Sequence, residues 1–152
     1  ILDAAGRTVV RIAHSTVLAE GAAWSTVTVK AADRFARFAF DAAGRETLMV
    51  DPTGAVVETT YDGVGRITAM RSYVNLAPVK TDATVQSSTT IKNTFSPNNS
   101  HDRRTVTEYD AAGRVVKQTS AAGTEAEAVV QSRFDGVGRL VVPVVVVVPA
   151  HV

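Results

Sequence analysis

The sequence predicts an all-β protein built from consecutive antiparallel β-hairpins. Three observations predict this class: a short turn motif recurs five times, several segments between the copies alternate polar and apolar residues, and the strand-favouring residues Thr and Val are abundant. The chain has 152 residues, of which 45% are hydrophobic, so it is long enough to bury a moderate core.

The recurring motif is Φ-Asp-x-x-Gly-Arg, where Φ is aromatic in four copies and is Leu2 in the first. Successive Asp residues are 38, 21, 48 and 25 positions apart, which indicates a unit of about 20 to 25 residues with two degenerate or skipped copies. The residues that we predict to define the repeat are Asp3, Gly6 and Arg7; Phe40, Asp41, Gly44 and Arg45; Tyr61, Asp62, Gly65 and Arg66; Tyr109, Asp110, Gly113 and Arg114; and Phe134, Asp135, Gly138 and Arg139.

The motif has the chemistry of a tight hairpin. An Asp at the first position of a type I turn accepts N–H bonds from the backbone two and three residues further on. A Gly three residues after the Asp supplies the left-handed conformation that closes a three-residue hairpin with a bulge. We expect the aromatic residue to pack on a neighbouring hairpin, with Arg over its ring or against an Asp of the next turn.

Strands are expected on both sides of these turns. Alternation predicts strands at 25–30, 46–50, 55–61, 67–73 and 105–109. A second turn type is predicted at 51–54, which has Pro52 and Gly54, and a weaker analogue at 121–124. The Ala-rich segments 17–24 and 124–131 fit either a short helix or a strand, and the repeat favours a strand in both.

The repeat divides the chain. We expect a repeat segment over 1–140, with a less regular insertion at about 72–105 that includes an exposed loop at 96–100. Residues 141–152 form a Val- and Pro-rich tail that is too short to span a membrane as a helix. An interior strand, a frame-shifted end and residues of uncertain assignment all remain open for this tail. Because the chain begins at Ile1, directly before a motif, we expect a fragment of a longer polypeptide.

The motifs at 61–66 and 109–114 resemble YD/Rhs repeats, which occur in bacterial Rhs effectors, in the B and C components of Tc insecticidal toxins and in teneurins. The resemblance spans 2–140 and is weakest in the middle. It implies a curved, spiralling sheet that forms part of a hollow shell around a C-terminal toxin domain. The implied partners are the rest of the shell and its toxin cargo, and the implied location is secreted or on the bacterial cell surface. The self-cleaving segment that ends such shells has no match here.

The function that this resemblance implies is structural: a shell segment of an Rhs- or Tc-type toxin that shields a cargo. The alternative is a surface adhesin or carbohydrate-binding module, in which Trp24 stacks on a glycan; packing between hairpins is the simpler role for that ring. A net charge of +1 argues against nucleic acid as a partner, and the absence of cysteine excludes thiolate chemistry.

No coherent catalytic or metal site emerges, and no cofactor is predicted. His14, His101 and His151 are scattered, and Ser100-His101-Asp102 are adjacent in sequence without implying the geometry of a triad. The repeated Asp residues are interpreted as turn residues rather than glycosidase acids or calcium ligands. Gly63-Val64-Gly65 lacks the spacing of a phosphate-binding loop, and Asn98 opens a glycosylation sequon that matters only in a secreted eukaryotic protein.

Overall fold

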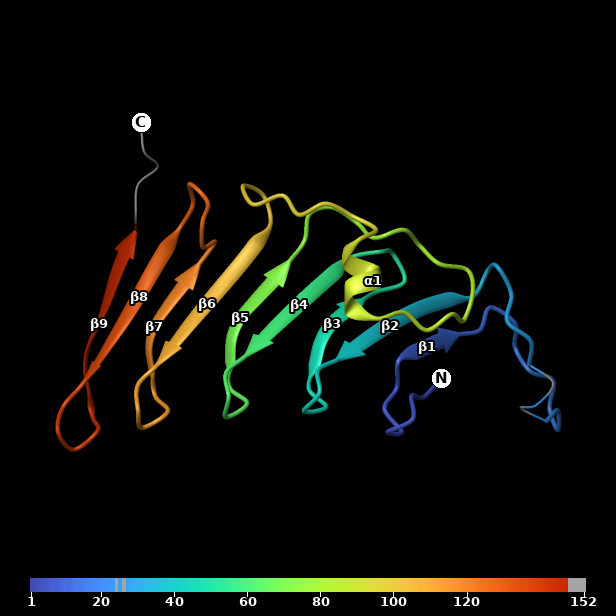
Figure 1. Cartoon of the computed structure of the whole chain (residues 1–152), viewed down its shortest axis with the longest axis horizontal. Helices are drawn as coiled ribbons and strands as arrows, with labels where there is room; N and C mark the ends of the chain where they lie inside the picture. Colours follow the sequence, from blue (N-terminus) through green and yellow to red (C-terminus); the bar gives the residue numbers. More distant parts are fainter. Residues whose placement is uncertain (24, 26, 148–152) are drawn as a thin grey trace. The chain divides into compact units, whose positions relative to one another are not determined.

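The computed structural model of the chain is nearly all-β and describes residues 1–23, 25 and 27–147 (Figure 1). The predicted fold class, all-β with consecutive antiparallel hairpins, is confirmed. The chain divides into two compact units, which are described separately: the first comprises Ile1–Val56 and Leu76–Ser96, and the second comprises Val57–Asn75 and the chain from Pro97 onward.

The first unit holds strands β1 (Val10–Ala13), β2 (Arg34–Phe40) and β3 (Glu46–Val50) and the helix α1 (Ser88–Lys92). The three strands pair antiparallel in sequence order. Strand β2 alternates strictly, so that Phe35, Arg37 and Ala39 share one buried face, which the segment from Ala77 to α1 covers. The core of the unit consists of Val9, Val10, Phe35, Ala39, Leu48, Val50, Val56, Ala77 and Ile91.

Arg37 is the anomaly of this core. It is only 3% exposed, and its Nε and Nη2 atoms are buried without a hydrogen-bond partner. Burial lowers the pKa of its guanidinium, and the charge of Asp82 acts in the opposite direction. A buried charge with unpaired N–H groups costs free energy, so Arg37 destabilises the face on which it lies.

Helix α1 was not predicted. Its five residues are too few for a helix that is stable alone, so its surroundings hold it in place. The side chain of Ser87 accepts a hydrogen bond from the Thr90 N–H at the start of the helix, and Ile91 inserts into the core with 2% of its surface exposed.

Apart from Val56, which belongs to the first unit, the second unit carries β4 (Val56–Tyr61), β5 (Ile67–Ser72), β6 (Arg103–Tyr109), β7 (Val115–Ser120), β8 (Ala128–Phe134) and β9 (Leu140–Val147). These strands also pair antiparallel in sequence order. The sequence predicts that the repeat segment ends at residue 140, but strand β9 continues beyond it and pairs with β8 as far as Val147. The division into a repeat segment and a tail remains a prediction, and residues 148–152 lie outside the described part of the chain.

Tight turns and longer loops lie at opposite ends of the strands within each unit (Figure 1). The predicted bulge is present in the four hairpins whose motif begins with an aromatic residue. In each, the strand register shifts directly before that residue, namely Phe40, Tyr61, Tyr109 and Phe134. The turns predicted at 51–54 and 121–124 are also confirmed by their backbone hydrogen bonds, Gly54 N–H to Asp51 C=O and Thr124 N–H to Ala121 C=O.

Three strand predictions, at 17–24, 25–30 and 124–131, were wrong in whole or in part. Among the described residues between 14 and 33, none lies in a strand, although 25–30 alternates well. The N–H of Lys30 is bound by the Asp33 carboxylate and is therefore not available to a neighbouring strand, and Val29 is 43% exposed rather than buried. The segment 124–131 is also only partly a strand, because residues 124–127 form a turn before β8 begins at Ala128.

Candidate functional site

The turn motif is a compact hydrogen-bonded unit, which the copy at Asp62 illustrates. Its Oδ1 atom accepts the N–H groups of Val64 (3.0 Å) and Arg66 (2.9 Å), and its Oδ2 accepts Nε–H of Arg66 at 2.6 Å. The N–H of Gly65 donates instead to the Asp62 carbonyl oxygen. The prediction that the Asp side chain binds the N–H three residues further on is therefore wrong. The Gly65 N–H bonds to the Asp62 backbone carbonyl, and the carboxylate binds the N–H of Arg66 instead.

All five copies share this geometry. In each, one carboxylate oxygen binds the backbone two and four residues on, and the other binds the Arg side chain; the five Asp residues are Asp3, Asp41, Asp62, Asp110 and Asp135. The Gly of every copy has a positive φ, between 77° and 92°, which glycine adopts without strain.

The electrostatics of the motif oppose acid catalysis. The backbone N–H of Arg114 and then its guanidinium hold the pKa of Asp110 below its ordinary value, and Arg139 does the same for Asp135. A general acid near neutral pH needs a raised pKa, as burial without a partner produces. These carboxylates instead stay ionised and occupied by donors of their own turns.

The Arg of the motif also joins one turn to the next. The guanidinium of Arg66 lies 4.6 Å from the centre of the Tyr109 ring, and its Nη1 makes a weak 3.5 Å bond to the Asp110 carbonyl oxygen. The same stacking occurs between Arg7 and Phe40 at 4.8 Å and between Arg114 and Phe134 at 4.3 Å. In these three copies the Arg pairs with the Asp of its own turn and stacks on the ring of the following one, and Arg7 and Arg66 also reach the backbone carbonyl of the following Asp.

A second pair of Asp residues, which the sequence reasoning missed, closes the two long loops. Asp33 directly precedes β2, and its side chain is 1% exposed. Its carboxylate accepts the N–H of Ser15 at 2.8 Å and of Lys30 at 2.9 Å, and contacts His14 Nδ1 at 2.8 Å. The backbone N–H of Ser15 and then that of Lys30 lower the pKa of Asp33 far below its ordinary value. The carboxylate thereby ties both ends of the loop between β1 and β2.

Asp102 repeats this arrangement in the second unit, directly before β6. Its buried carboxylate accepts the N–H of Val74 at 2.8 Å and of Asn98 at 3.0 Å, and it pairs with Arg71 at 2.6 Å. In both loops an Asp binds one N–H near the start of the loop, one three or four residues before itself, and one basic side chain. The sequence signal was an Asp-Arg pair at the end of each non-repetitive stretch.

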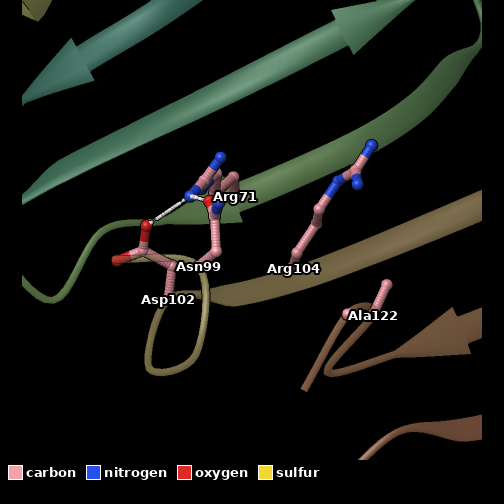
Figure 2. Close-up of a pocket in the computed structure, with 6 residues that line it drawn as sticks. Arg71, Asn99, Asp102, Arg104 and Ala122 are labelled. Carbon is pink, nitrogen blue, oxygen red and sulfur yellow. Dashed lines mark hydrogen bonds and ion pairs between the residues drawn. The ribbon is translucent and has the colours of Figure 1, made fainter. Parts of the chain in front are cut away.

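Figure 2 shows the surroundings of this second carboxylate. Nη2 of Arg71 donates to Asp102 and, at 2.6 Å, to Oδ1 of Asn99, and the Arg71 guanidinium stacks at 4.8 Å on the Tyr73 ring. Arg104 extends beside it from β6, because the two residues face each other across the β5–β6 pair. Together with the turn at Ala122, they line a cavity of about 310 Å³.

The remaining candidates from the sequence are not brought together. The Asp102 carboxylate is occupied by donors other than His101, whose Nδ1 lies 3.2 Å from the Asn98 side-chain oxygen. His14 contacts Asp33, as described above, and Trp24 and His151 lie outside the described residues. Within the described part of the chain, no group of three metal-binding side chains occurs, and no helix is long and apolar enough to cross a membrane.

The fold and the repeated turn define a β-hairpin repeat protein. The family model described as RHS Repeat matches residues 29–73, which include the second and third turn motifs. This part of the chain therefore carries an RHS repeat, and the predicted resemblance to YD/Rhs repeats is confirmed.

Two solved structures have the same fold. They are titled "Crystal Structure of TcdB2-TccC3-Cdc42" and "Crystal Structure of TcdB2-TccC3-TEV", and each matches with a TM-score of 0.52 and 18% identity over 76% of this chain. The chain spans about 6% of the length of either protein. A comparison with curated protein sequences found no match.

Proposed function

We propose that this chain is a structural segment of a shell of the Rhs or Tc type, and that the shell encloses a toxin domain encoded elsewhere in the same system. The observation that carries the proposal is the link between turns, in which the Arg of one motif stacks on the aromatic ring of the next. Such a link favours a long, regular wall of hairpins, since every added hairpin brings both halves of the next contact.

The similarity to the TcdB2-TccC3 structures supports this role through the fold that they share. The proposed partners are further hairpins of the same shell and the cargo within it, and the proposed location is outside the producing cell or on its surface. The motif carboxylates support a role without catalysis, because each is ionised and bound within its own turn.

Limited proteolysis of the longer polypeptide that we propose would test the enclosure of a cargo. We expect the cargo to resist protease in the wild type and to be cleaved when Arg66→Ala and Arg114→Ala remove two links between turns. Arg103→Ala is the matched control, because Arg103 is an exposed arginine outside the motif. Equal cleavage of the cargo in the wild type and in the double variant would contradict enclosure.

A glycan array tests the role as an adhesin. Binding that depends on Trp24 would contradict a purely structural role.

An enzyme assay tests the proposal that the chain has no catalytic activity. Hydrolase or nuclease turnover that disappears in His101→Ala would contradict that proposal.

A further inference from the structure

We propose that the cavity beside Arg71 and Arg104 binds the carboxylate of an acidic peptide segment. This inference goes beyond the role as a shell segment and does not depend on the enclosure of a cargo. It rests on the charges of the cavity, on its donors and on the shape of the adjoining space.

The cavity contains one guanidinium without a counter-ion. Arg71 is neutralised by Asp102, at 2.6 Å, whereas the Arg104 side chain has no hydrogen bond or ion pair among the described residues. The two arginines are directly opposite each other on β5 and β6, and like charges in that position repel. An anion between them would relieve this repulsion, and a single negative charge is enough to balance Arg104.

The available donors match a carboxylate. A guanidinium presents a planar fork of N–H groups that binds two carboxylate oxygens in parallel. The side-chain oxygen of Asn99 accepts a hydrogen bond from Arg71. Its amide N–H groups have no partner among the described residues and provide further donors at the same cavity. Arg104 is exposed, so a ligand reaches it from solvent.

The surroundings favour a peptide over a sugar. Sugar rings bind best on open aromatic faces, but no aromatic residue lines the cavity, and the Arg71 guanidinium covers the nearby Tyr73 ring. A second cavity of about 350 Å³ adjoins the first at Gly123 and is lined by Ser100, His101, Gly123, Thr124, Glu125 and Ala126. This second space extends the first, so there is room for the residues that flank an acidic side chain.

The turn that forms one wall is strained. Ala121 has a φ of 51°, and it is the only residue other than glycine with a positive φ in the described part of the chain. The neighbouring Ala122 donates its N–H to the Arg104 carbonyl oxygen at 2.9 Å, which fixes this turn against the strand that bears the free guanidinium. Strained backbone of this kind occurs often at binding sites.

A titration of the 152-residue chain with the blocked tripeptide Gly-Glu-Gly, followed by the NMR signals of the arginine Nε–H groups, tests the proposal. We expect millimolar binding, as befits one carboxylate on a small ligand. Arg104→Gln should weaken it about tenfold, because a charge-assisted contact is lost. Arg104→Lys should fall between, since it keeps the charge and loses the fork.

The matched control is Arg103→Gln, which removes the same charge from the adjacent exposed residue on the opposite face of β6. It should change the affinity less than about twofold, because Arg103 does not line the cavity and solvent screens its charge. Circular dichroism checks that each variant stays folded. Absence of binding, equal weakening by Arg103→Gln, or equal binding of the Gly-Gln-Gly peptide would overturn the site. Equally tight binding of glucuronate or inorganic phosphate would overturn its assignment to peptides.

Discussion

Replacing Gly54 by Ala tests how closely the 76–96 segment packs on the first unit. Gly54 has a φ of 91° and is buried, and a Cβ there would lie 2.3 Å from the Ala77 carbonyl oxygen. The N–H of Ala77 donates to the Gly54 carbonyl at 2.8 Å, so the two backbones are in direct contact. Gly65 provides a matched control, because its φ is 92° and a Cβ there would meet nothing within 4 Å.

The two substitutions share one cost and differ in another. A positive φ costs Ala about 1–2 kcal/mol, and the reduced entropy of the unfolded chain offsets about 0.4–1 kcal/mol of this at either position. At Gly54 the Ala77 carbonyl must also move, which adds about 1–3 kcal/mol for overpacking and about 1 kcal/mol for the lost hydrogen bond. We therefore expect Gly54→Ala to lower the free energy of unfolding by about 2–4 kcal/mol more than Gly65→Ala does.

Urea denaturation of both variants measures the two free energies, and hydrogen exchange at the Ala77 amide reports the local contact. Faster exchange of that amide is expected in Gly54→Ala and not in Gly65→Ala. Equal destabilisation by the two substitutions, with unchanged exchange at Ala77, would refute the close packing on which the estimate rests.

Four further predictions concern single charged groups. Asp102→Asn should lower the free energy of unfolding by about 3 kcal/mol in urea denaturation, because it breaks a buried ion pair from one side, whereas Asn99→Ser should have a much smaller effect. Burial alone would raise the pKa of Asp102, but the Val74 N–H and the Arg71 guanidinium hold it below 3.8. The stabilisation by this carboxylate is therefore present above the pKa of Asp102 in the unfolded chain, and it is lost as the pH falls through the pKa of Asp102 in the folded protein. The urea midpoints at about pH 7 and about pH 3 should accordingly differ less in Asp102→Asn than in the wild type. Arg37→Met should raise the free energy of unfolding by about 1–3 kcal/mol, since it replaces an unpaired buried charge, and a lower urea midpoint would contradict this. Arg66→Lys should lower the free energy of unfolding by about 0.5–1 kcal/mol and shift the NMR signals of the Tyr109 ring, which lose the stacked guanidinium; an unmoved ring signal would argue against the link.

The turns could be predicted from the sequence because their determinants are local. Asp62, Gly65 and Arg66 lie within five residues, and each has a conformational or bonding role that chemistry assigns without knowledge of the rest of the fold. Even so, the sequence reasoning assigned one hydrogen bond to the wrong N–H, because it did not account for the bond that the Gly N–H makes within the turn. The strands at 46–50 and 67–72 followed from the turns that flank them.

What the sequence did not reveal depends on residues far apart in the chain. The carboxylate of Asp33 binds groups up to 19 positions away and that of Asp102 up to 31, and no local pattern specifies these partners. The alternation of 25–30 was misleading for the same reason, because a strand needs a neighbouring edge and Asp33 already holds the N–H of Lys30. Helix α1 is likewise maintained by the burial of Ile91 rather than by its own five residues.

The stacking of Arg7, Arg66 and Arg114 on the ring of the following turn gives these contacts a direction. In all three contacts the guanidinium comes from the earlier copy and the ring from the later one, as in Arg7 with Phe40 and Arg114 with Phe134. When a gene gains or loses one whole hairpin, the two hairpins that become neighbours still form this contact. The earlier one supplies the arginine and the later one supplies the aromatic ring. Evolution can change the length of such a protein by duplication or deletion without designing a new interface, provided that each event keeps whole copies intact.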